Sequence, residues 1–318
     1  MTAQSVLVSG ATGFVGRALV AALRAQQRQV RCALRETAPD NAGNDFIVGD
    51  IGPDTDWQPA LRGIDCVVHL AARTHVLRES AADPLRAYRH INVGGTRRLA
   101  QQAAAAGVRR FVFLSSIKVN GESTSEHPFT ANDAPQPLDA YGISKREAED
   151  VLRQIGADTS MEIVILRPPL VYGPGVKGNF LRLLQAVERG TPLPLASIEN
   201  RRSLVYVGNL VDAIITCIDA PAAAGKTWLV SDGEDVSTPA LIRKLAAALE
   251  LSPRLLPCPP ALLHFSAALL GKRAAAMRLT GSLAVDGSAL RQAIGWQPRY
   301  SLDQGLKATA QWYHQSQN

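Results

Sequence analysis

Tyr141 and Lys145 lie four residues apart at the start of a predicted helix, so their side chains should share one face of it. The pKa of a free tyrosine is about 10, too high for a base at neutral pH, but a nearby ammonium group favours the phenolate. Tyr141 could then exchange a proton with a hydroxyl or a ketone. Ser116 ends a predicted strand, at the edge where open parallel sheets place their ligands. An isolated Tyr and Lys pair is more often a surface feature, so its meaning depends on the neighbouring motifs.

The strongest of these motifs is a glycine-rich segment near the N-terminus. It contains Gly10, Gly13 and Gly16, follows a predicted strand and opens a predicted helix. Glycine at these positions lets the backbone turn tightly and approach a pyrophosphate at the N-terminus of the helix. The segment therefore predicts a bound dinucleotide, and with it an oxidoreductase role for Tyr141 and Lys145.

The residues at the end of the second predicted strand help to distinguish NAD from NADP. An acidic residue at this position normally binds the ribose hydroxyls of NAD. Here the position holds Leu34, and Arg35 after it could pair with the 2′-phosphate of NADP, because guanidinium matches phosphate geometry. Glu36 could take the acidic role slightly later in the chain. We therefore favour NADP(H), with NAD as the alternative.

Apolar runs alternate with helical patterns through the first half, as in a parallel sheet covered on both faces. The predicted strands span residues 5–9, 29–34, 45–48, 65–70, 110–115, 162–166 and 227–230. Predicted helices span 16–26, 84–107 and 141–155, with apolar residues three and four positions apart. The early connections are thus βαβ crossovers. The fold class predicted is α/β, a Rossmann doubly wound parallel sheet.

After Pro168 the sequence changes to Pro- and Gly-rich loops and separate helices, at 179–189, 238–249 and 260–278. We expect a dinucleotide-binding Rossmann domain over residues 1–171. Residues 201–231 should return to it, with 204–207 and 227–230 rejoining the sheet. Residues 172–200 and 232–318 should form a smaller C-terminal α/β substrate-binding domain.

Composition narrows the class of protein. The 318 residues carry a net charge of +6, but the basic residues are scattered, so we expect an anionic small substrate and no nucleic acid. Four separated cysteines lack metal or redox spacing, so we expect no metal and a reducing, cytoplasmic location. We also expect no secretion signal and no membrane span, since the longest apolar stretch, 259–271, is shorter than the about 20 residues needed.

Residues 259–278 carry more apolar surface than a covering helix needs. We expect their leucines and Phe265 to pack against the predicted helix at 238–249 and close the substrate domain. The alternative is a helix at a membrane surface, with basic residues near anionic lipid.

Together these motifs resemble the extended short-chain dehydrogenase/reductase family, and in particular its nucleotide-sugar epimerase, dehydratase and reductase branch. The resemblance extends to the C-terminus. Besides the residues above, it rests on Asp50-Ile51, His69-Leu70-Ala71-Ala72, Asn92, Thr96, Arg167-Pro168, Tyr172-Gly173-Pro174-Gly175, Asn179, Pro192-Leu193-Pro194, the segment from Arg202 to Asp212, and Gly295-Trp296.

The resemblance implies that Ser116, Tyr141 and Lys145 form the catalytic triad, with Ser116 hydrogen-bonding the reacting oxygen. Its implied cofactor contacts are Gly10, Gly13, Phe14, Val15, Gly16, Arg35, Asp50, Ile51, Leu70, Ala71, Ala72, Tyr141, Lys145 and Pro168. The substrate implied is a nucleotide sugar, with UDP the expected carrier and a polyprenyl diphosphate the alternative. We also expect a homodimer.

On the substrate side, Asn179 and Arg202 resemble the family's diphosphate contacts, and the backbone around Leu193 resembles its uracil contact. Arg278 is a further candidate. In many epimerases the corresponding arginine is followed three positions later by an acidic residue that binds the ribose, whereas this sequence has Gly281 there. The ribose contact of the family is therefore in doubt here.

The residues after Ser116 narrow the reaction. Related 4,6-dehydratases carry an acidic pair there and 3,5-epimerase-reductases usually a cysteine, whereas this chain has Ile117 and Lys118. Two reactions at C4 of the sugar remain. Arg35 favours reduction of a UDP-linked 4-keto-6-deoxy-N-acetylhexosamine by NADPH, in precursor synthesis for surface polysaccharides. The alternatives are a UDP-hexose 4-epimerase with recycled NAD and, from another class, a regulator that senses NADP without turnover.

Overall fold

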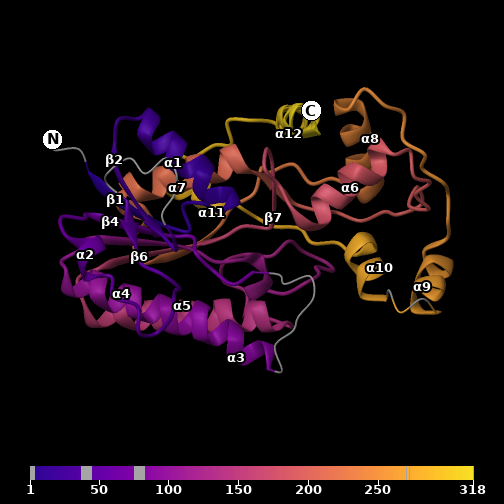
Figure 1. The fold of residues 1–318 in the computed structure, drawn as a ribbon. Coiled ribbons are helices and arrows are strands. Elements are labelled where there is room, and N and C mark those ends of the chain that lie inside the picture. Colours follow the sequence, from indigo (N-terminus) through magenta and orange to yellow (C-terminus); the bar gives the residue numbers. More distant parts are fainter. Residues whose placement is uncertain (1–3, 37–44, 75–82, 270, 272, 318) are drawn as a thin grey trace.

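The computed structural model describes residues 4–36, 45–74, 83–269, 271 and 273–317, and its centre is a seven-stranded parallel sheet (Figure 1). The strand order is β3-β2-β1-β4-β5-β6-β9. The order reverses between β1 and β4, and sheets of this class bind their ligands at such a reversal. The strands are β1 (Ser5–Ser9), β2 (Gln29–Leu34), β3 (Phe46–Ile47), β4 (Cys66–His69), β5 (Arg110–Leu114), β6 (Glu162–Arg167) and β9 (Lys226–Leu229).

Alternate side chains of the central strands enter two different cores. In β1, Val6 and Val8 enter one core and Leu7 enters the other. This alternation follows from the two-residue period of a strand, and it buries the sheet on both faces. Three helices cover the first core: α1 (Phe14–Ala25), α7 (Val207–Asp219) and α11 (Ser288–Ile294). The second core is covered by α2 (Gln58–Leu61), α4 (Thr96–Ala105) and α5 (Ala140–Asp158).

A third core lies beside the sheet and forms the smaller part of the molecule. Its helices are α6 (Gly178–Glu188), α8 (Thr238–Ala248) and α12 (Leu302–Gln317), which meet around side chains such as Phe180 and Leu245. A two-stranded parallel sheet of β7 (Leu170–Tyr172) and β8 (Leu204–Tyr206) leads into it. The predicted α/β fold class and doubly wound sheet are confirmed.

One predicted sheet strand is wrong. Residues 227–229 of the predicted strand 227–230 join the sheet within β9, but 204–207 do not, because β8 pairs with β7 instead. Val205 and Val207 nevertheless pack into the first core, so the segment covers the sheet without extending it. Leu290 and Trp296 also belong to this core, although the predicted division assigns 232–318 to the substrate domain.

The predicted helix over 84–107 is built from three successive pieces. They are α3 (Pro84–Tyr88), the π-helix η1 (Arg89–Gly95) and α4. Asp83 caps α3, because its side chain accepts a hydrogen bond from the backbone of Arg86. π-Helical turns inside α-helices are frequent at functional sites, and η1 carries Asn92. The remaining short turns are the 3₁₀ helices η2 (Ile117–Val119) and η3 (Pro221–Ala223).

The prediction that residues 260–278 form a helix whose apolar side chains are packed is wrong, because most of the described side chains there are exposed. The segment forms two helices, α9 (Pro260–Leu269) and α10 (Arg273–Thr280), at the end of the molecule remote from β1 (Figure 1). No residue of α9 is buried, and only Leu263 among its leucines packs against the third core. Within the described residues, no helix combines the length and the apolar character needed to cross a bilayer.

Candidate active site

The glycine-rich loop forms a tight cradle between β1 and α1. Gly10 has a φ of +72°, and a β-carbon there would lie 2.7 Å from the backbone nitrogen of Ala71, so a side chain would be strained and crowded. A β-carbon at Gly16 would collide with the carbonyl oxygen of Gly10. The first turn of α1 has no side-chain cap, which leaves its amides available to an anion. These residues fit the pyrophosphate of a dinucleotide.

The structure brings the predicted catalytic residues together. Ser116 follows β5 and accepts a hydrogen bond from the backbone of Lys118 at 3.2 Å, and its side chain is hydrogen-bonded to Tyr141. Tyr141 and Lys145 lie one turn apart near the N-terminus of α5. Asp139 caps that helix by accepting a hydrogen bond from Gly142 N–H at 2.7 Å.

Burial shifts the proton affinities of these groups. It raises the pKa of Tyr141, helped by the negative charge of Asp139, and the hydrogen bond with Ser116 opposes the rise. Burial also lowers the pKa of Lys145 to about 7, and the charge of Glu149 acts in the opposite direction. The Lys145 ammonium lies over the Phe113 ring, 4.1 Å from its centroid. A lysine close to its titration point can move or hold a proton near neutral pH.

A buried charged network lies next to Ser116 and Lys145 in the chain, and it is centred on Glu149 and Arg167. The Glu149 carboxylate accepts hydrogen bonds from Arg167 at 2.9 Å and 2.6 Å and from Ser115 at 2.5 Å. Arg167 also donates to Asn120 at 2.9 Å. The network joins α5 to the ends of β5 and β6, so it fixes the positions from which Ser116 and Lys145 extend. Sequence reasoning missed Glu149, although it continues the four-residue spacing of Tyr141 and Lys145.

The structure pairs Arg35 with another candidate cofactor residue. Its guanidinium Nε lies 2.9 Å from a carboxylate oxygen of Asp50, and both side chains are exposed. Ile51, next to Asp50, packs partly into the second core. Arg35 therefore stands at the end of β2, where the adenosine ribose would lie, but its charge is balanced by Asp50. Glu36 is exposed beside it.

The other cofactor candidates line the carboxyl ends of the central strands. Leu70 and Ala71 follow β4 and donate backbone hydrogen bonds to Ser9, at 3.2 Å to its carbonyl and at 3.4 Å to its hydroxyl. Pro168 follows β6, and its carbonyl accepts a hydrogen bond from Ile117 at 3.0 Å. All of these strands end at the same edge of the sheet as β1 and β5. The remaining candidates there are Ala72 after β4, and Phe14 and Val15, which are half-buried at the start of α1.

Asn92 proves to be a core residue. Its side chain exchanges two hydrogen bonds with the backbone of Arg73 and donates a third to Ser144 at 2.9 Å. It thereby ties η1 to the loop after β4 and to α5. This is the structural role expected of a buried amide.

Two of the substrate candidates lie together. Arg202 donates hydrogen bonds to the carbonyl of Arg278 at 2.8 Å and to that of Gly281 at 3.1 Å, so it closes the C-terminal end of α10. Both backbone groups of Leu193 already form hydrogen bonds within the protein. Its N–H donates to the carbonyl of Arg254, and its carbonyl accepts from the N–H of Leu256. A uracil contact would have to use a neighbouring backbone group. Asn179 is exposed on α6.

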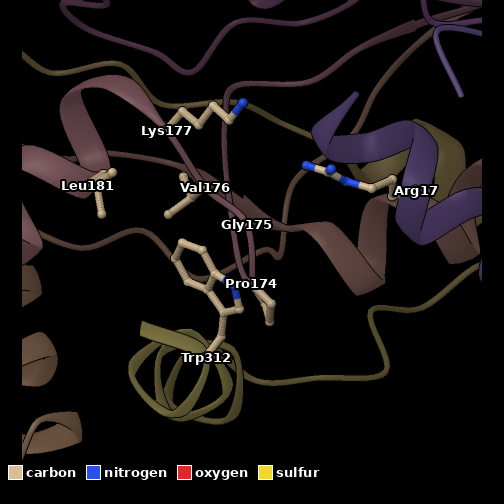
Figure 2. Close-up of a pocket in the computed structure, with 7 residues that line it drawn as sticks. All are labelled: Arg17, Pro174, Gly175, Val176, Lys177, Leu181 and Trp312. Atoms are coloured by element: carbon tan, nitrogen blue, oxygen red, sulfur yellow. The ribbon is translucent and has the colours of Figure 1, made fainter. Parts of the chain in front are cut away.

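A cleft of about 500 Å³ lies beside the phosphate loop, between α1, the loop after β7, α6 and α12. Figure 2 shows Lys177 and Arg17 pointing toward one another across it, with the Trp312 ring below. None of the predicted catalytic residues lines the cleft. Its lining residues are Arg17, Pro174, Gly175, Val176, Lys177, Leu181 and Trp312.

The arrangement supports acid–base chemistry beside a dinucleotide. Tyr141 can take or give a proton, Ser116 can hold the oxygen that loses or gains it, and Lys145 can favour the phenolate. The carboxyl edge of the sheet, the glycine cradle and the open first turn of α1 provide the space and the donors for the cofactor.

Comparison with known proteins agrees with this arrangement. A model described as NAD dependent epimerase/dehydratase family matches residues 6–231. A UDP-glucose 4-epimerase of Vibrio cholerae is 48% identical over 318 residues, covering 99% of this chain and 97% of that protein. A structure of MoeE5 in complex with UDP-glucuronic acid and NAD is 27% identical, with a TM-score of 0.80, and the match covers 98% of this chain and 99% of the other. A structure of RMD from Pseudomonas aeruginosa complexed with NADPH is 25% identical, with a TM-score of 0.75, and covers 98% of this chain and 99% of the other.

Proposed function

Because the chain belongs to the NAD dependent epimerase/dehydratase family, we propose that it is a UDP-hexose 4-epimerase that recycles its NAD. The observation that carries the proposal is the 48% identity, over nearly the whole chain, to a UDP-glucose 4-epimerase. The related MoeE5 structure, which holds a UDP-sugar and NAD, supports the same substrate class and cofactor. The reaction requires acid–base groups at one carbon only, and Ser116, Tyr141 and Lys145 supply them.

The proposed mechanism uses these residues twice. Tyr141, as the phenolate, takes the proton of the C4 hydroxyl, while Ser116 hydrogen-bonds the same oxygen. Lys145 favours the phenolate through its positive charge. The chemistry supplied by a bound dinucleotide is the acceptance and return of a hydride at C4. Inversion requires the sugar to turn over within the site, so that C4 presents its opposite face to the returning hydride, and Tyr141 then gives the proton back to the C4 oxygen.

A direct test is to incubate the purified protein with UDP-glucose without added cofactor. We expect UDP-galactose to form until equilibrium is reached, and NAD to be released when the protein is denatured. A UDP-linked 4-keto-6-deoxy-N-acetylhexosamine with NADPH provides the opposing assay. If that sugar oxidises NADPH while UDP-glucose and UDP-N-acetylglucosamine stay unchanged, the epimerase proposal is wrong.

The second candidate function is the reduction of such a 4-keto sugar by NADPH, and Arg35 is the observation that favours it. Its guanidinium lies at the end of β2, where we expect the adenosine ribose, and both Arg35 and its partner Asp50 are exposed. The NADPH complex of the RMD structure shows that relatives of this fold use that cofactor.

Arg35→Asp separates the two cofactors. We expect the variant to bind NADPH about tenfold or more weaker, because a repelling carboxylate replaces a cation beside the 2′-phosphate. Binding of NADH should change much less, so it serves as the internal control. The measurement is the dissociation constant of each cofactor by fluorescence titration. Equal changes for both would mean that Arg35 has no contact with the 2′-phosphate.

A further inference from the structure

The exposed apolar side chains of this protein are concentrated in one segment. In the described part of the chain, large apolar residues are exposed at eleven positions, and seven of these lie in residues 251–279. They are Leu251, Leu256, Leu262, Phe265, Leu269, Met277 and Leu279. Single exposed apolar residues are ordinary, but a cluster of this kind marks an interaction surface.

The exposed residues of α9 lie on one face of the helix. Leu262, Phe265 and Leu269 follow a spacing of three and four, and they are 57%, 64% and 73% exposed. Leu263 and His264 face the opposite way and are half-buried, since Leu263 packs on the third core and His264 hydrogen-bonds to Thr280 at 3.2 Å. α9 is therefore attached to the molecule by one side and presents an apolar stripe to solvent on the other.

The charge of the same segment is one-sided. Residues 251–285 contain no Asp or Glu, and they contain four basic residues, Arg254, Lys272, Arg273 and Arg278. Arg273 and Arg278 are exposed on α10, which also presents Met277. An apolar stripe flanked by basic residues matches the boundary between acyl chains and anionic head groups. A protein partner would need acidic residues around an apolar groove to match this segment.

We propose that α9 and α10 bind the surface of an anionic lipid bilayer, with Leu262, Phe265 and Leu269 inserted among the lipids and Arg273 near the head groups. The substrate candidates Arg202 and Arg278 meet at the end of α10, so a bound bilayer would lie near these two predicted substrate contacts. Binding through α9 and α10 would place the protein at a membrane surface, whichever sugar reaction the site performs.

The test is co-sedimentation with vesicles. We expect the wild-type protein to sediment with vesicles that contain phosphatidylglycerol and to stay largely in solution with pure phosphatidylcholine. The double variant Phe265→Gln/Leu269→Gln should bind about tenfold or more weaker. Arg273→Glu should weaken binding to anionic vesicles only, and added salt should have the same effect. Leu138→Gln is the matched control, because Leu138 is 74% exposed and belongs to neither α9 nor α10.

Several results would overturn the proposal. One is a wild-type protein that sediments with neither kind of vesicle; another is a double variant that binds like the wild type. Sedimentation equilibrium covers the case of a second copy on this face. If the wild type ignores vesicles and the double variant has a lower mass than the wild type, α9 is a subunit contact. If vesicles are ignored and only the KM for the UDP-sugar rises, α9 covers the substrate. Circular dichroism melting of each variant confirms that it is folded.

Discussion

Replacing Tyr141 by phenylalanine is expected to lower kcat by about two to four orders of magnitude, the range over which a positioned acid–base group contributes. The ring remains and keeps its place at the start of α5, but the group that exchanges the proton and hydrogen-bonds to Ser116 is lost. Binding of UDP-glucose and the content of bound dinucleotide should stay close to the wild-type values. The measurements are the rate of UDP-galactose formation, substrate affinity by calorimetry, and the cofactor released on denaturation.

Tyr88 provides the matched control for this substitution. Its ring meets that of Tyr141 edge-on, with the centroids 6.2 Å apart, and its hydroxyl donates to the carbonyl of Thr74 at 3.0 Å. Tyr88→Phe also removes a phenolic hydroxyl, but one that is not proposed to exchange a proton, so it should leave kcat within a few-fold of the wild type. Unchanged turnover in Tyr141→Phe would contradict the catalytic assignment. A regulator that senses NADP without turnover predicts a different result, in which even the wild-type protein binds the cofactor but converts no sugar.

The second large effect is expected from Glu149→Gln. Glu149 is fully buried and Arg167 is 2% exposed, so the substitution leaves a guanidinium in the interior without its counter-charge. Breaking one partner of a buried pair costs about 3 to 5 kcal/mol. We expect a loss of that order in the free energy of unfolding, measured by chemical denaturation. Glu147→Gln, on the same helix but in the exposed pair with Arg89, should change it little.

The same variant has a second readout that a purely structural role would not give. Burial alone would raise the pKa of Glu149, but the hydrogen bonds and charge of Arg167 lower it overall, so the carboxylate is charged at neutral pH. Its charge raises the pKa of Lys145. Glu149→Gln should therefore lower the pKa of Lys145 and move the alkaline limit of activity to lower pH. An unchanged pH profile, with stability lost, would restrict Glu149 to holding the fold.

The pH dependence of stability follows from the sign of the Glu149 shift. A carboxyl with a folded pKa below its unfolded value of about 4.3 contributes stability above that value. The contribution is lost as the pH falls through the folded pKa. The wild-type protein should keep it across the neutral range, and Glu149→Gln should lose it at every pH above the acid transition.

The first half of the fold could be predicted from sequence because local signals and tertiary packing agree there. Strands β1 and β2 have the predicted bounds, since each is a short apolar run between a loop and a helix. The glycine cradle and the proximity of Tyr141 and Lys145 could be predicted for a similar reason, because both depend on spacing along the chain.

The second half was harder because its packing is non-local. α7 is buried on most of its surface, and the helical spacing of its polar residues Asp212, Thr216 and Asp219 was not used to predict a helix there. β8 has the composition of a sheet strand, but it pairs with β7 and not with a strand of the large sheet. The sequence of β8 alone does not specify this partner. The apolar residues of α9 predicted burial, although nothing in the described chain covers most of them. Glu149 was missed because its partner Arg167 approaches only after β6 and α5 have packed.

The chain crosses more than once between the large sheet and the smaller part that contains the third core, so the two parts should unfold together. The polypeptide leaves the large sheet after β6, builds β7 and α6, and then returns through β8 and α7 to add β9 before leaving again. A fragment that stopped after the first crossing would expose β6 as an unpaired edge strand and would remove α7 from the core it fills. The core of the large sheet is therefore completed by helices that follow segments of the smaller part in the chain, such as α7. The molecule should melt as one thermodynamic unit, and proteolysis within either part should unfold both.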